Sequence, residues 1–126
     1  MNPRSLINRS GFLFVAALAV SGTAAAVDHN TATLELTQAM TAVQAAERDD
    51  AARYAPADLD QAHALLDSAQ SAADSREWTD AAMYSERAKV VGDLASSRSR
   101  QHRAEAATAE IERSVDSLRQ ELGGAP

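Results

Sequence analysis

The chain has 126 residues, with 18 Asp and Glu against 12 Lys and Arg, a formal net charge of −6 and no cysteine. The length suits one domain, the negative charge disfavours nucleic acid as a partner because phosphates are repelled, and the absence of cysteine excludes disulfide bonds. Alanine supplies much of the apolar content and aromatic residues only 4% of the chain, so we expect closely packed helices around a thin core.

Residues 1–26 have the three parts of a cleaved export signal. These are a positive start at Arg4 and Arg9, an apolar run over 12–20, and small residues at 24–26. The apolar run is about half as long as the ~20 residues that a membrane-spanning helix requires. We therefore expect a soluble mature chain that begins at Val27 in the periplasm, with secretion as the alternative. Because no cysteine can carry a lipid, no stable membrane anchor is expected.

The scarcity of turn residues predicts an all-α fold. Pro56 and Gly92 are the only proline and glycine between Val27 and Leu122, and hairpins between strands need turn residues of these types. A first helix is expected over residues 33–53, where apolar residues recur at helical spacing. They are Leu36, Ala39, Met40, Val43 and Ala46.

A second helix is expected from Pro56 to about Asp74. The residue before a proline is pushed out of the helical region, and proline itself suits the first position of a helix. One apolar stripe along it contains Leu59, Ala62, Leu66, Ala69 and Ala73. The residues expected to pack the hairpin of the second and third helices are Tyr54, Pro56, Leu59, Leu66, Ala69, Trp78, Ala81 and Ala88.

A third helix is expected from Glu77 to the glycines at 123–124. A stripe of small residues in its first half suits close packing against the second helix, and contains Trp78, Ala81, Ser85, Ala88, Gly92 and Ala95. A second stripe keeps heptad phase through Met83, Val90, Leu94, Ser97, Gln101, Ala104, Thr108, Ile111, Val115, Leu118 and Leu122. The polar stretch 96–101 allows a continuous solvated helix or a kink, and we favour continuity.

The expected fold is a three-helix antiparallel bundle over residues 27–122, with an extended last helix and a flexible tail at 123–126. Two helices of about 20 residues cover only about half of the third, so its second half overhangs. A candidate interaction seam then faces water, formed by Ile111, Val115, Leu118 and Leu122. The alternative is that the third helix bends back or that its last turns fray.

Four segments of the hairpin, 54–62, 65–69, 76–81 and 84–88, carry a resemblance. An aromatic residue and Ala-Pro open one helix, and an aromatic residue precedes alanines seven apart in the next. The hairpin resembles a bacterial envelope family known as domain of unknown function 4398. Members commonly occur as small lipoproteins or ahead of OmpA-like peptidoglycan-binding domains, so the resemblance implies an envelope location and a role as a helical spacer or interaction module.

The family has no assigned catalytic residues. This sequence has neither a lipidation cysteine nor an OmpA-like region, so membrane anchoring and cell-wall binding are not carried over. The spacing of Trp78, Ala81 and Ala88, with Ala69 in the preceding helix, is also similar to a tetratricopeptide repeat. A solenoid generally needs at least three repeats, so a peptide groove of that type is not expected.

Any acid–base or transition-metal site would start from the three histidines, His29, His63 and His102. His63 shares a helix face with Asp60 and Asp67, but so acidic a chain produces such groupings by chance, and paired His or Cys ligands are absent. We expect no metal site, and we expect His29 in a flexible, exposed start. With no nucleophile motif and no glycine-rich phosphate loop, neither catalysis nor a cofactor is expected.

Half of the cations of the expected mature chain gather near the middle of the third helix, namely Arg87, Lys89, Arg98, Arg100 and Arg103. They either meet anionic headgroups or acids of a partner, or are neutralised within the chain. We favour neutralisation by acids at the end of the first helix, Glu47, Asp49 and Asp50.

The leading hypothesis is a non-enzymatic, exported scaffold or interaction module that acts through its last helix, by self-association or by docking to a partner protein. The alternative is a small periplasmic binding or stress-protective protein that sequesters a metal ion or an unfolded chain with its acidic surface.

Overall fold

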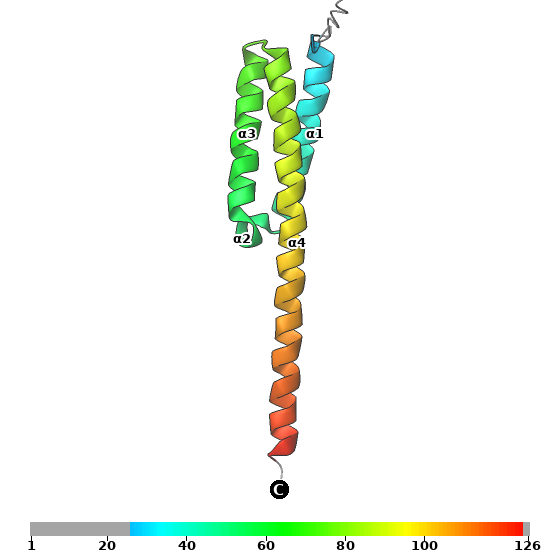
Figure 1. Ribbon diagram of the computed structural model, residues 1–126, viewed down its shortest axis with the longest axis vertical. Helices are drawn as coiled ribbons and strands as arrows, with labels where there is room; N and C mark the ends of the chain where they lie inside the picture. Colours follow the sequence, from blue (N-terminus) through cyan, green and yellow to red (C-terminus); the bar gives the residue numbers. More distant parts are fainter. Residues whose placement is uncertain (1–25, 125–126) are drawn as a thin grey trace, which may run out of the picture.

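A computed structural model describes residues 26–124, and all regular structure in this range is helical. The helices are α1 (His29–Arg48), α2 (Ala51–Tyr54), α3 (Pro56–Asp74) and α4 (Trp78–Gly123). α3 packs antiparallel to both α1 and α4, and α4 continues far past the ends of the other two (Figure 1). The predicted three-helix bundle with an extended last helix is confirmed. Residues 1–25 of the predicted export signal lie outside the described range.

α1 begins at His29 rather than at Thr33, because Asp28 caps it. The Asp28 carboxylate accepts a hydrogen bond of 2.8 Å from the backbone N–H of Thr31. The His29 ring meets Trp78 edge-on, with ring centroids 4.7 Å apart and an interplanar angle of 89°. The expectation of a flexible start at His29 is therefore wrong, since this residue is helical and held against the hairpin.

The single helix predicted over 33–53 is also wrong, because the chain leaves the helical conformation at Asp49 and Asp50. α1 ends at Arg48, and Asp50 takes a left-handed φ of 63°, a conformation that aspartate tolerates better than most residues. The short α2 follows. This turn brings Ala51 and Ala55 into the core cluster that also holds Leu59 and Val43.

α4 is the central helix, with α1 and α3 on either side of it (Figure 1). Its small-residue face is buried at Ala81, Ser85, Ala88, Gly92 and Ala95. Gly92 permits a close approach, since a Cβ at this position would lie 3.1 Å from backbone atoms of Ala42 and Val43 in α1. The small-residue stripe, expected against the second helix, therefore packs against α1 as well as α3.

α4 is continuous through residues 96–101, as predicted. Part of this stretch is not solvated, however, because Ser96 and Ser99 are buried. They extend the small-residue face by another turn beyond Ala95. Within residues 26–124, no helix has the length and apolar character needed to cross a membrane.

Candidate interaction surface

The second half of α4, residues 101–123, stands free of the bundle and is called the overhang. Every residue from 101 to 124 is exposed, and the last buried residue of α4 is Ser99. At 1.5 Å per residue, the overhang projects about 35 Å past the bundle, as Figure 1 shows. α4 reaches Gly123 as one helix, so the alternatives of a helix that bends back or frays early are wrong.

Ile111, Val115, Leu118 and Leu122 lie along one side of the overhang, at alternating spacings of four and three residues. Their exposed fractions are 64%, 37%, 57% and 81%. Two helices interlock in a coiled coil through residues at this spacing, and aliphatic side chains gathered in water are characteristic of contact surfaces. The residues of the predicted seam thus form an exposed apolar surface, and its use as an interface stays a prediction.

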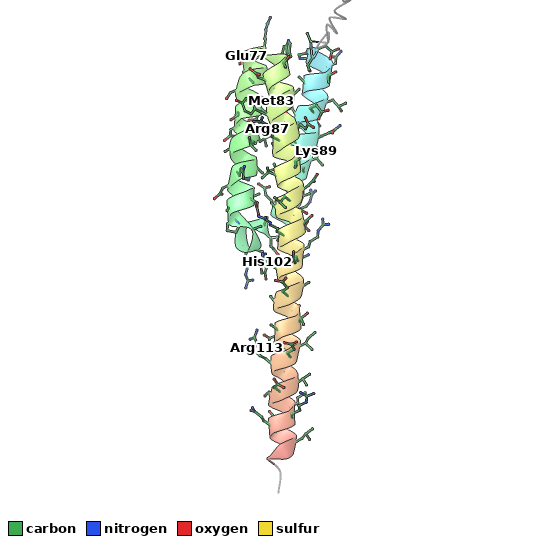
Figure 2. The ribbon with its side chains drawn as sticks, viewed as in Figure 1. Glu77, Met83, Arg87, Lys89, His102 and Arg113 are labelled. Carbon is green, nitrogen blue, oxygen red and sulfur yellow. The ribbon has the colours of Figure 1, made fainter. Side chains whose placement is uncertain are left out.

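The same heptad phase continues into the bundle half of α4, where Met83, Val90 and Leu94 are exposed as well. The outer stripe is defined here as the heptad positions Met83, Arg87, Val90, Leu94, Ser97, Gln101, Ala104, Thr108, Ile111, Val115, Leu118 and Leu122. In the bundle half, each apolar member is two residues, or ~200° of helical turn, from a buried small residue. The outer stripe therefore starts on the face of α4 opposite to the one that α1 and α3 cover. Figure 2 labels Met83 and Arg87 on this half of α4.

A shallow groove runs beside the outer stripe between α3 and α4. It is lined by Gln61, Leu65, Glu86, Arg87, Val90 and Val91. Leu65 and Val91 are half-buried, whereas Glu86 and Arg87 are exposed. The groove therefore combines an apolar lining with charged side chains, which suits an amphipathic helix.

Polar contacts with Asp49 bind α4 to the turn after α1, at the end of the bundle from which the overhang projects. Arg100 donates a hydrogen bond of 2.8 Å to the Asp49 carboxylate, and Ser96 donates a second one to the same oxygen. Ser99 donates to the backbone carbonyl of Asp49. These three donors hold the turn and the base of the overhang together.

The Asp49 contacts also change proton affinities. The Arg100 guanidinium, followed by the Ser96 hydroxyl, holds the pKa of Asp49 below its ordinary value, and Asp49 in turn raises the pKa of Arg100. Both shifts favour the charged forms, because each charge is hydrogen-bonded to the other. In the overhang, a hydrogen bond from Gln101 and one with His102 lower the pKa of Glu105.

Two arginines of the predicted basic cluster pair with acids that were predicted to neutralise them. Arg100 lies 2.7 Å from Asp49, and Arg103 lies 3.7 Å from Asp50. Glu47 does not join them, because it pairs with His63. For these two arginines, the prediction of neutralisation within the chain is confirmed.

Two other cations of the cluster bind partners that the sequence did not indicate. Arg98 donates from one nitrogen to both carboxylate oxygens of Asp58 in α3, at 2.8 and 2.9 Å. Lys89 donates to the side-chain oxygen of Gln38 in α1 at 3.1 Å. The cations therefore connect α4 to both of its neighbours.

Two of the three histidines lie at the surface, each beside a glutamate. His63 Nε2 is 3.0 Å from Glu47, and His102 Nδ1 is 3.2 Å from Glu105. The His63 side chain is thus held by α1 rather than by the acids of its own helix face. Over residues 26–124, no group of three or more His, Cys, Asp or Glu side chains is arranged to hold a metal ion.

The residues predicted to pack the hairpin differ in burial. Leu59, Ala69, Ala81 and Ala88 are buried, Tyr54, Leu66 and Trp78 are half-buried, and Pro56 is exposed. Pro56 is the first residue of α3, so it acts by starting the helix and not by packing. The guanidinium of Arg53 lies 5.1 Å from the centre of the Tyr54 ring, a cation–π distance.

The fold and this surface define an all-helical domain built around one long central helix. Residues 34–111 match the model of the family described as Domain of unknown function (DUF4398). Because the match spans more than half of the chain, the chain belongs to that family, as the resemblance of the hairpin predicted. Ile111 is the last matched residue, and the other three seam residues follow it. Comparisons with curated proteins and with solved structures find no match.

Sequence reasoning missed the two serine hydrogen bonds to Asp49 and the exposure of Met83, Val90 and Leu94. A signal for the first was present, since the small-residue stripe continues from Ala95 to Ser99 at helical spacing. No local pattern in the sequence indicates that these three apolar residues are exposed. Whether an apolar residue of α4 is covered depends on which faces of the helix α1 and α3 occupy.

Proposed function

We propose that the chain is an exported, non-enzymatic scaffold or interaction module of the bacterial envelope that acts through helix–helix contacts of its overhang. The contact is made with a second copy of the chain or with a partner protein. One observation carries the proposal: the overhang presents Ile111, Val115, Leu118 and Leu122 to water at coiled-coil spacing.

Several other features support it. The signal pattern over residues 1–26 supports export. The negative charge disfavours a nucleic-acid partner. His63 is half-buried and His102 is exposed, and each is paired with a surface glutamate, an arrangement that supports a non-enzymatic role.

Two opposing free energies determine how strong a contact through the seam can be. Fully burying four large aliphatic side chains contributes roughly 6–12 kcal/mol at about 1.5–3 kcal/mol each. Association costs about 4–15 kcal/mol in lost translational and rotational freedom. A contact limited to the seam is therefore weak, and a stable complex needs further apolar contacts along α4.

In-cell photo-crosslinking tests the proposal. A photo-reactive amino acid replaces Leu118 in the seam or, as a matched control, Gln120, which lies ~200° away around the helix. In cells that express the full chain, we expect a discrete product from position 118 and none from position 120. The added substitution Val115→Asp should abolish the product. Equal products at both positions, or none at 118, would contradict the proposal.

A further inference from the structure

We propose that the occupant of the outer stripe is a second copy of this chain, in an antiparallel dimer. The overhang of each protomer lies along the bundle half of its partner's α4. This inference rests on the proposed function and deepens it, because it names the partner and the geometry of the contact. Three properties of α4 support it: length, register and charge.

The two halves of α4 have equal lengths. α4 has 46 residues, and the exposed stretch begins at residue 100, one residue after the last buried one. The bundle half, 78–100, and the overhang, 101–123, therefore contain 23 residues each. In an antiparallel pair with its two-fold axis between residues 102 and 103, two residues from the middle of α4, each overhang lies beside residues 82–104 of the partner and so covers all but the first turn of the partner's bundle half. The interface is isologous and closes on itself.

The register of the outer stripe fits this pairing. With the axis between residues 102 and 103, Met83 faces the partner's Leu122, Val90 faces the partner's Val115, and Leu94 faces the partner's Ile111. Near the axis, Ser97 faces the partner's Thr108 and Gln101 faces the partner's Ala104. Apolar side chains thus meet apolar ones, and the polar middle of one stripe meets the polar middle of the other.

Arg87 is the charged position of the outer stripe, and it distinguishes the antiparallel pair from a parallel one. In the antiparallel register it faces the partner's Leu118, where its aliphatic stem packs while the guanidinium reaches water. A parallel, in-register pair would set two arginines against each other, which is unfavourable. A dimer in which only the ends of the two overhangs overlap would leave Met83, Val90 and Leu94 exposed to water.

The charges beside the outer stripe make two kinds of cross-pair. Arg98, one guanidinium nitrogen of which is bonded to Asp58 in α3, lies opposite the partner's Glu105 with its remaining nitrogens, and this attractive pair occurs twice by symmetry. Glu86 lies opposite the partner's Glu121, a repulsive pair that also occurs twice. The repulsive pair lies at the exposed rim, where its cost is small, and it provides a way to test the register.

Disulfide mapping tests the pairing directly, because the chain has no cysteine of its own. Full-length Ser97→Cys chains are mixed with full-length Thr108→Cys chains under mild oxidation. We expect the mixed disulfide to dominate over both homodimers. Ser97→Cys mixed with Gln120→Cys is the matched control and should give no excess of the mixed product. Disulfide homodimers as the main product would indicate parallel pairing and overturn the proposal.

A charge-reversal cycle gives an independent test in the full-length chain. Glu86→Lys alone and Glu121→Lys alone should each tighten the dimer about fivefold in analytical ultracentrifugation, since two repulsive pairs become attractive. The double variant should return to the wild-type dissociation constant. Glu110→Lys, on the opposite face of the overhang, makes the same charge change and should have no effect. Single variants that do not tighten the dimer would overturn the register.

The outcomes separate this inference from the proposed function. If the wild type and both single variants remain monomeric at every concentration, the dimer is overturned. Crosslinking of position 118 to a different protein would then leave the proposed function intact, with that protein as the occupant of the outer stripe.

Discussion

The two halves of α4 use side-chain size in opposite ways. In the bundle half, the face buried against α1 and α3 consists of alanine, serine and glycine, while larger apolar side chains such as Val90, with 60% exposure, point away from the bundle. In the overhang, the large aliphatic residues are all exposed and no neighbouring helix is present. In the bundle half of α4, the fully buried residues are small, and Met83, Val90 and Leu94 are exposed.

Small and large apolar residues of α4 contribute to packing in different ways. Small residues let helices approach closely, as at Gly92, but they remove little apolar area from water. Large aliphatic residues bury more area, and on α4 most of them, such as Val90 and Leu118, lie exposed on the outer stripe. Close contacts between small side chains therefore stabilise the bundle. The exposed aliphatic side chains, whose burial would be favourable, lie on the outer stripe, which is the surface that we assign to association.

The largest expected effect comes from truncating one leucine in each region. Leu59 is 6% exposed in the core, so Leu59→Ala should lower the free energy of unfolding by about 3 kcal/mol. Leu118 is 57% exposed, so Leu118→Ala should change it by less than about 0.5 kcal/mol in dilute protein. Urea unfolding at several protein concentrations measures both. The effect of Leu118→Ala should grow with concentration, and equal effects in dilute protein would refute the contrast.

A smaller effect is expected at two serines of α4. The Ser85 hydroxyl oxygen is buried and has no hydrogen-bond partner among residues 26–124, so Ser85→Ala should stabilise the fold by about 1–2 kcal/mol. Ser97→Ala, on the exposed outer stripe, should add only about 0.5 kcal/mol through helix propensity. Thermal unfolding of the two variants compares them. A destabilising Ser85→Ala would show that this hydroxyl has a partner in solution.

The smallest effect concerns the Asp49 contacts and depends on pH. Because Arg100 and Ser96 lower the pKa of Asp49 in the folded state, the charged carboxylate stabilises the fold above the ordinary Asp pKa. This contribution is lost as the pH falls through the lowered folded value. Asp49→Asn should therefore be less stable than the wild type at pH 7, and the difference should shrink below about pH 4.

Thermal unfolding from pH 2 to 7 checks this dependence on Asp49. Asp116→Asn is the matched control, since Asp116 pairs with Arg119 in the overhang at 3.2 Å and does not contact the bundle. It should unfold like the wild type across this range. A constant difference between wild type and Asp49→Asn at all pH values would show that the charge of Asp49 does not contribute.

Much of the fold could be predicted because its signals are local. Helical spacing, the proline at position 56 and the scarcity of glycine predict the hairpin and the long last helix, and the heptad spacing indicates the seam. The break at Asp49 and Asp50 was missed because two consecutive aspartates are compatible with a helix surface. Only the core position of Ala51 and the donors from Ser96, Ser99 and Arg100 make the turn favourable.

The sequence by itself determined the helical class, the family, the unequal helix lengths and hence the existence of an overhang, because these depend on spacing and counting along the chain. The tertiary structure decided that three large apolar residues in the bundle half of α4 are exposed. Met83, Val90 and Leu94 look like core residues in the sequence, yet they lie outside, since α1 and α3 both pack on the opposite, small-residue face of α4. Whether a residue is buried depends on which faces of the helices pack together. Close approach at residues such as Gly92 determines these faces, and the pattern of a single helix does not.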